Sequence, residues 1–168
     1  MPRFTGEVRR SDENVEVGLI YDDDIRVRFN GWNLVGNPFV CNAFVLTEQG
    51  QTVDFYEIVG DSLSLTDNNE IAPCQGIFVQ AESDVQTVTF SRTAPAKRSG
   101  VLNMNLTQGR AKVDMARIRF GEGRNLGRLS FNDNSTKLYI PMDGKDYAVV
   151  YSEGIGEVPV SFKAENNG

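Results

Sequence analysis

The sequence contains no histidine among its 168 residues. Histidine is the usual general base at neutral pH and a common ligand of catalytic zinc. Its absence therefore excludes Ser-His-Asp and Cys-His nucleophile systems and most catalytic zinc sites. The chain is also short of positive charge, with 17 Lys and Arg against 23 Asp and Glu, which gives a net charge of −6. This balance argues against a nucleic-acid partner, which requires a basic surface.

Long apolar runs are also missing, because no stretch reaches the roughly 18 apolar residues that a membrane-spanning helix needs. We therefore expect no membrane insertion. Only two cysteines occur, Cys41 and Cys74. They form either one disulfide or two small thiols that pack like apolar residues, and the sequence leaves both alternatives open.

What the sequence does contain is a period of two. Apolar residues alternate with polar ones in five segments: Val15–Tyr21, Ile25–Phe29, Leu102–Leu106, Ala116–Phe120 and Val158–Phe162. No window carries the apolar stripe of an amphipathic helix. Turn residues separate the β-rich runs at the spacing of sandwiches and barrels. The pattern predicts an all-β, jelly-roll-like sandwich of about ten to twelve antiparallel strands.

One polar stretch, Ser91–Gly100, interrupts this pattern and contains Pro95. It indicates a long connection within a single domain spanning 1–168, and the alternative is two halves, 1–91 and 100–168, joined by a linker. The chain stops at Glu165–Gly168, a turn signature with no strand after it. We therefore expect the natural polypeptide to continue and the sequence to be an excised fragment.

Candidate site residues are few. Trp32, Tyr139 and Tyr151 are weak candidates for stacking against a sugar ring, although large aromatic rings more often pack in a core or at its rim. The acidic runs Asp22–Asp24 and Asp67–Glu70 lack the spacing of a calcium loop and are interpreted as solvated turns. We predict no catalytic residue, no metal ligand and no cofactor.

The segment Gly31–Phe39, with the sequence GWNLVGNPF, resembles a segment found in large secreted and cell-surface proteins of the Bacteroidetes. Further segments follow in the same order as in those proteins: Ile71–Val79, Asp114–Gly123, Lys137–Pro141, Gly144–Val150 and Val158–Ala164. The resemblance implies a β-sandwich module near the C-terminus of an exported protein. It offers no catalytic residues to carry over.

At the start of the GWNLVGNPF segment, the pair Asn30-Gly31 predicts a type I′ turn, in which both central residues have a positive φ. We expect Trp32, Leu34, Phe78 and Val79 to supply packing between sheets.

The main hypothesis is a non-catalytic structural or adhesive module, located outside the cell or on its surface. Its expected partners are neighbouring domains of the same polypeptide and either a glycan or a surface protein. The alternative hypothesis is a carbohydrate-binding module, and strand addition at an open sheet edge is a further option. A carbohydrate-active enzyme is the third hypothesis. It requires two facing carboxylates, and among the 23 acidic residues no pair is distinctive in the sequence.

Overall fold

The computed structural model describes residues 13–21, 29–66, 69–95, 100–131, 135–154 and 156–164. The strand predicted over Ile25–Phe29 lies outside these residues except for Phe29, as do the acidic run Asp22–Asp24 and part of Asp67–Glu70. In the described part the fold is all-β and contains no α-helix, as the alternation predicts.

The structure contains fourteen strands in the described residues. They are β1 (Val15–Gly18), β2 (Trp32–Gly36), β3 (Ala43–Leu46), β4 (Tyr56–Val59), β5 (Ser62–Leu65), β6 (Glu70–Ile71), β7 (Gly76–Gln80), β8 (Thr87–Ser91), β9 (Gly100–Gln108), β10 (Ala111–Phe120), β11 (Leu126–Gly127), β12 (Lys137–Met142), β13 (Lys145–Ser152) and β14 (Ser161–Lys163). This exceeds the expected number because β6 and β11 are only two residues long, too short to show an alternating pattern.

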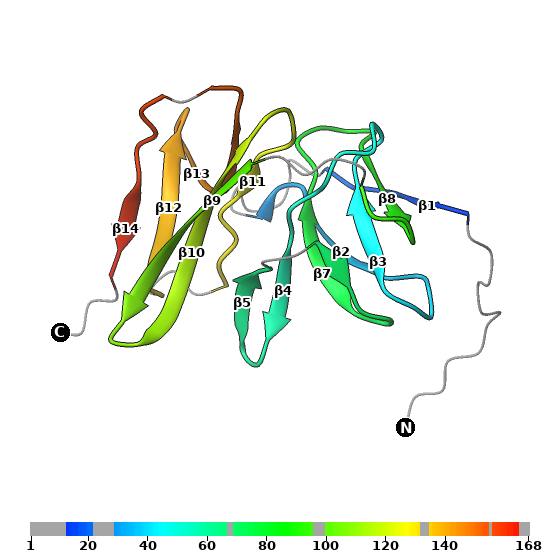
Figure 1. The fold of residues 1–168 in the computed structure, drawn as a ribbon, viewed down its shortest axis with the longest axis horizontal. Helices are drawn as coiled ribbons and strands as arrows, with labels where there is room; N and C mark the ends of the chain where they lie inside the picture. The colour runs from blue at the N-terminus through cyan, green and yellow to red at the C-terminus, as the bar shows by residue number, and fades with distance from the viewer. Residues whose placement is uncertain are drawn as a thin grey trace.

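The strands form three sheets (Figure 1). The first sheet has the order β1-β8-β3-β6, and the middle sheet has the order β2-β7-β4-β5. The third sheet has the order β14-β12-β13-β10-β9, with β11 paired to β13. Every pairing is antiparallel except that of β10 with β13, which is parallel, so the expectation of antiparallel strands throughout was wrong at this pair. The chain can pair these two strands in parallel because β11 and β12 intervene and return it to the starting end of the sheet.

The middle sheet lies between two hydrophobic clusters. On β7, Ile77 and Val79 pack with β3 and β8 of the first sheet, whereas Phe78 points to the opposite face. That opposite face carries Tyr56 and packs against the third sheet. The first and middle sheets are thus consistent with the expected sandwich, and the third sheet adds a further layer.

The cluster between the middle and third sheets contains residues from both sides of the Ser91–Gly100 stretch. Its buried members are Tyr56, Leu65, Met115, Leu126, Leu129, Ala148 and Val149. A third cluster, which includes Ile118 and Ile140, lies on the other face of the third sheet. This sheet is strongly curled, because β9 contacts β12 although β13 and β10 separate them in the strand order.

Two asparagines of the GWNLVGNPF segment tie loops to the sheets. The Asn33 side chain accepts a hydrogen bond from the backbone N–H of Ile20 and donates to its carbonyl, both at 2.9 Å. The buried Asn37 amide donates to the carbonyl oxygens of Cys41 and Ile71 at 2.9 and 3.1 Å. The packing role expected of Leu34 was wrong, since its side chain is 67% exposed. Leu34 shares the face of Trp32 and lies opposite Phe78, but it belongs to none of the hydrophobic clusters.

The turn that precedes β2 depends on Gly31. Its φ is +72°, whereas Asn30 does not share the left-handed conformation, so the turn is not the expected type I′. The Gly31 carbonyl accepts a hydrogen bond of 2.7 Å from the N–H of Ala81 at the end of β7. A Cβ atom at Gly31 would lie 2.0 Å from the Ala81 carbonyl oxygen. Glycine therefore allows β2 and the end of β7 to approach.

Replacing Gly31 with alanine is expected to lower the free energy of unfolding by roughly 3 kcal/mol or more, because a clash with backbone is added to the left-handed strain. Gly50 is the matched control, since its φ is +76° and nothing lies within 4 Å of a Cβ placed there. Gly50→Ala should cost only the strain of about 1–2 kcal/mol. Urea unfolding of the two variants measures the difference, and equal losses would contradict the close approach at Gly31.

Candidate functional site

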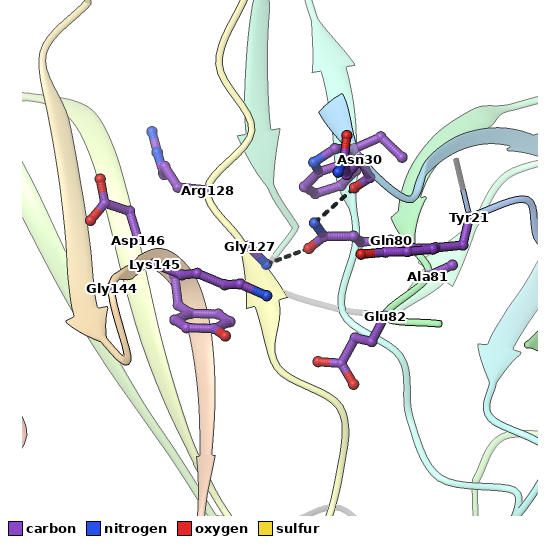
Figure 2. A pocket seen from close by; sticks show the side chains of 12 residues that line it. Tyr21, Asn30, Gln80, Ala81, Glu82, Gly127, Arg128, Gly144, Lys145 and Asp146 are labelled. Carbon is purple, nitrogen blue, oxygen red and sulfur yellow. Dashed lines mark hydrogen bonds between the residues drawn. The ribbon is translucent and has the colours of Figure 1, made fainter. Parts of the chain in front are cut away.

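A pocket of about 490 Å³ opens where the middle and third sheets meet (Figure 2). Its volume lies within the range of roughly 300–1,000 Å³ that small-molecule sites occupy. The lining residues come from the two halves of the sequence: Tyr21, Asn30, Trp32, Gln80, Ala81, Glu82, Gly127, Arg128, Gly144, Lys145, Asp146 and Tyr147. The pocket thus exists only where the two halves are packed together.

Gln80, the last residue of β7, joins the two sides of the pocket. Its side-chain oxygen accepts a hydrogen bond of 2.8 Å from the backbone N–H of Gly127 in β11. Its side-chain nitrogen donates to the carbonyl oxygen of Asn30 at 3.3 Å. A Cβ atom at Gly127 would lie 2.5 Å from the Gln80 oxygen, so a glycine in β11 leaves room for this amide. The two hydrogen bonds of the Gln80 amide thus connect both sides of the pocket.

Charged groups of both signs line the pocket. Partial burial raises the pKa of Glu82, and the positive charges of Arg124 and Lys145 offset part of that effect. Burial also raises the pKa of Tyr147, with a further contribution from the negative charges of Glu82 and Asp143. The two acids Glu82 and Asp146 thus face the two bases Arg128 and Lys145 around one cavity.

Two lining residues carry buried polar atoms that lack a hydrogen-bond partner within the described residues. These atoms are Oδ1 of Asn30, an acceptor, and Nε of Arg128, a donor. The rest of the Arg128 guanidinium is paired, since it lies 2.6 Å from a carboxylate oxygen of Asp114 and donates to the Tyr56 hydroxyl at 3.2 Å. Both atoms are closed to solvent, so their missing partners are a cost to the stability of the fold and do not offer a contact to a molecule in the pocket.

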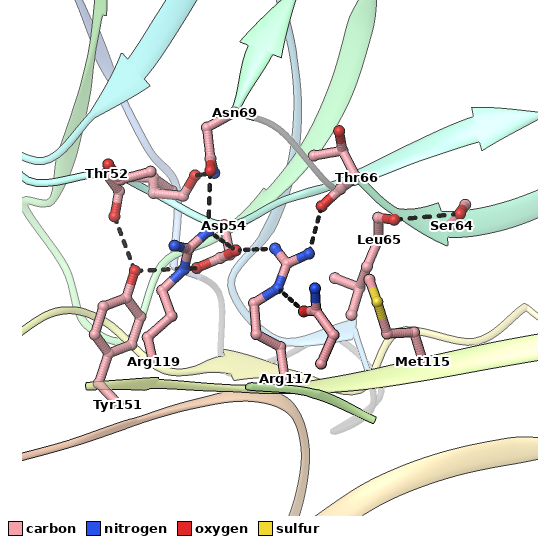
Figure 3. Close-up of polar contacts among 12 residues, drawn as sticks. Thr52, Asp54, Ser64, Leu65, Thr66, Asn69, Met115, Arg117, Arg119 and Tyr151 are labelled. Atoms are coloured by element: carbon pink, nitrogen blue, oxygen red, sulfur yellow. Dashed lines mark hydrogen bonds and ion pairs between the residues drawn. The ribbon is translucent and has the colours of Figure 1, made fainter. Parts of the chain in front are cut away.

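A second polar feature, the core ion cluster of Asp54, Arg117 and Arg119, lies between the middle and third sheets (Figure 3). Asp54 precedes β4, and the two arginines are neighbours on the same face of β10. The Asp54 carboxylate accepts from Arg117 Nη1 at 2.7 Å and from Arg119 Nη2 and Nε at 2.8 and 2.5 Å. All three side chains are almost completely buried.

Neighbouring polar groups satisfy the remaining donors of the core ion cluster. Arg117 donates to the side chain of Asn103 and to the carbonyl of Thr66, each at 2.8 Å. Arg119 donates to the Asn69 side chain at 2.9 Å. The Tyr151 hydroxyl lies 3.0 Å from both an Asp54 oxygen and the carbonyl oxygen of Thr52. The cluster therefore links β10 and β13 of the third sheet to the segment that leads into β4.

The two tyrosines at this interface remain protonated at neutral pH. Burial, and then the negative charge of Asp54, raises the pKa of Tyr151. Burial raises the pKa of Tyr56 to about 12, although the positive charge of Arg128 acts in the opposite direction. Both hydroxyls therefore act as hydrogen-bonding groups of the interior and not as bases.

The structure separates the three aromatic residues singled out from the sequence. Trp32 lines the pocket, and its ring centroid lies 5.8 Å from that of Tyr56. Tyr151 contacts the core ion cluster through its hydroxyl. Tyr139 is half-buried on β12, where it pairs with Ser161 of β14, and does not line the pocket. Of the three, only Trp32 lines this pocket.

Cys41 and Cys74 are both free thiols, so the disulfide alternative is not the one that the structure contains. Cys41 packs against the first hydrophobic cluster, whereas Cys74 is exposed in a turn with a φ of +60°. In the described residues, no group of three or more His, Cys, Asp and Glu side chains is placed to hold a metal ion. None of the described segments forms a helix long and apolar enough to cross a membrane.

Sequence analysis missed most of the pocket. Tyr21, Gln80 and Glu82 lie far from Lys145 and Tyr147 in the chain. Lys145 and Tyr147 belong to the Gly144–Val150 segment of the resemblance, which implied no site residues. The GWNLVGNPF segment pointed to one edge of the pocket, because Asn30 and Trp32 flank Gly31. The partner of Gln80, the backbone N–H of Gly127, leaves no signal in a sequence beyond the glycine itself.

Fold and site together define an all-β module with a ligand-sized pocket between its sheets and an ion cluster in its interior. Comparisons with family models, with curated proteins and with solved structures gave no significant match.

Asp54→Asn is expected to lower the free energy of unfolding by about 3–5 kcal/mol, because it leaves two buried arginines without their countercharge. Tyr151→Phe removes one hydrogen bond from the same carboxylate and should cost about 1 kcal/mol. Asp61→Asn changes an exposed turn residue and serves as the control, with an effect within about 0.5 kcal/mol. Thermal and urea unfolding measure all three, and a loss as small for Asp54→Asn as for Asp61→Asn would contradict a structural role for the cluster.

Proposed function

We propose that this chain is a non-catalytic structural and adhesive module of an exported bacterial cell-surface protein. The observation that carries the proposal is the core ion cluster. Asp54 is its only carboxylate and is fully occupied by two arginines and a tyrosine, so the cluster stabilises the packing of the sheets and offers no free acid or base. A module held together in this way keeps its surface in a fixed shape, which suits a spacer or a presenting domain.

The cell-surface location rests on the resemblance of Gly31–Phe39 and the segments after it to exported proteins. The structure assigns these residues to packing and turns, since Gly31 fits a left-handed turn and Asn33 and Asn37 bond to backbone. A segment of this kind supports a shared fold and carries no chemistry of its own.

The test uses cells that naturally display the parent protein. Antibody raised against the chain should label intact cells, and deletion of the segment should reduce attachment of the cells to surfaces while the rest of the protein is still displayed. Labelling that appears only after permeabilisation would contradict export. Unchanged attachment by the deletion strain would contradict the adhesive role.

A second candidate function, carbohydrate binding, is favoured by the composition of the pocket. Tyr21, Trp32 and Tyr147 supply aromatic surface, and the exposed carboxylate of Asp146 supplies a hydrogen-bond acceptor. Sugar rings combine apolar faces that stack on aromatic side chains with hydroxyl groups that donate hydrogen bonds. The equal numbers of acidic and basic residues around the pocket favour a neutral saccharide over a charged one.

Trp32 is the only tryptophan of the chain, so its fluorescence reports directly on the pocket. A glycan array identifies the saccharide, and its titration should change the Trp32 emission with saturation. Asp146→Ala should weaken binding roughly tenfold, the equivalent of one lost hydrogen bond, because an exposed acceptor of the lining is removed. The same variant should unfold within about 0.5 kcal/mol of the parent, because the Asp146 side chain is exposed.

Asn42→Ala is the matched control, because the Asn42 side chain is exposed and bonds to Glu70 away from the pocket. It should bind the saccharide like the parent chain. A glycan array without binding, or equal affinities of the Asp146→Ala variant and the parent, would contradict carbohydrate recognition in this pocket.

A further inference from the structure

The third sheet ends in an edge strand without the usual protection. β9 spans Gly100–Gln108, pairs only with β10 among the described strands, and has no hydrogen-bonded neighbour there on its other side. Its nine residues exceed the usual five or six of a strand by a clear margin. It contains no charged residue and no proline, the two commonest means of keeping an edge strand from pairing with another chain.

The other edge strands of the described sheets differ from β9. At the opposite end of the third sheet, β14 has three residues, ends on Lys163 and follows Pro159. In the first sheet, β1 carries Glu16 and β6 has only two residues. The middle sheet ends in β2 and β5, of five and four residues. β9 is thus the long, uncharged edge of this fold.

β9 also exposes apolar side chains. Val101 and Leu102 are 43% and 48% exposed, although both are large and aliphatic. Further along the strand, Met104 and Leu106 are half-buried against the third hydrophobic cluster. A strand added beside β9 would cover this apolar surface and satisfy the outward backbone groups at the same time.

The five central residues of β9 read the same in both directions about the middle residue. Leu102-Asn103-Met104-Asn105-Leu106 is a palindrome, and Met104 lies at the centre of Gly100–Gln108. An antiparallel pair of identical strands has a two-fold axis, which brings a palindrome into register with itself. Met104 then faces its own copy, and Leu102 faces Leu106 of the other chain.

We infer that β9 pairs antiparallel with β9 of a second copy of this chain, with the two-fold axis at Met104. Because opposite residues share a face, the leucines and methionine of both copies form one apolar row next to the third hydrophobic cluster of each. The asparagines lie on the other face, where Asn103 is already held by Arg117 at 2.8 Å. The product is a symmetric dimer with one continuous sheet across the two copies.

The register predicts that Val101 of one copy lies opposite Thr107 of the other. Both side chains are exposed. Within each copy Val101 pairs with Arg119 of the core ion cluster and Thr107 with Lys112, so urea unfolding of each variant is needed to show that the new charges leave the cluster intact. The variant V101E/T107E places two pairs of like charges across the dimer, whereas V101E/T107K places two pairs of opposite charges there.

Sedimentation velocity and light scattering over a concentration series measure the state of the chain. The parent chain should dimerise, and V101E/T107E should raise the dimer dissociation constant roughly tenfold or more through two opposed like-charge pairs. V101E/T107K should restore the dimer. V113E is the control, because Val113 is 41% exposed on β10 and away from the edge, and it should dimerise like the parent chain.

A parent chain that is monomeric up to millimolar concentration would overturn self-pairing and leave the β9 edge to a strand of another protein. A dimer that V101E/T107E does not weaken would overturn it as well, since another surface would then join the copies. Far-UV circular dichroism and urea unfolding of each variant confirm that the monomers are folded alike. With that check, a weaker V101E/T107E dimer together with a restored V101E/T107K dimer supports this register and no other.

Discussion

The packing of the sheets depends on one carboxylate. Asp54 joins the segment before β4 to two arginines of β10, and Tyr151 of β13 completes its shell. Taking two guanidinium groups and a carboxylate out of water is costly, and only the full set of partners offsets that cost. The cluster therefore determines how the sheets pack more than it adds to their stability. The apolar surfaces of Tyr56 and Met115 could pack in several ways, whereas this hydrogen-bond geometry permits one. The pocket at the same interface inherits its shape from that restriction.

Alternation of apolar and polar residues was sufficient to predict the fold class and several strands, among them β1, β9 and β10. It did not predict β3, whose residues Ala43–Leu46 are almost all buried and show no alternation. Nor did it predict the parallel pairing of β10 with β13, because pairing direction follows from the path of the chain and not from local pattern. Alternation also does not indicate that the polar face of β10, with Arg117 and Arg119, is buried, since a buried guanidinium looks the same in a sequence as an exposed one.

The candidate site could be predicted only at one edge. Trp32 lines the pocket and belongs to the GWNLVGNPF segment, which the sequence alone already marks as a motif. Tyr151 was chosen for the same aromatic character, yet its hydroxyl is held by a carboxylate in the interior. What distinguishes the two rings is their partners: Tyr151 meets Thr52 and Asp54, which lie 99 and 97 residues before it in the chain. Local patterns carry no information over that separation.

The long separation also orders the events of folding. Asp54 lies 63 residues before Arg117 and 97 residues before Tyr151. During synthesis the N-terminus emerges first, so Asp54 emerges well before either arginine. The first and middle sheets can therefore pair their strands while this carboxylate is still hydrated. Closing loops of such length is slow, and we expect the third sheet to dock last, trapping the carboxylate as it does so. Until then the face of the middle sheet that carries Tyr56 and Phe78 stays open to water, and such transiently exposed apolar surface favours aggregation.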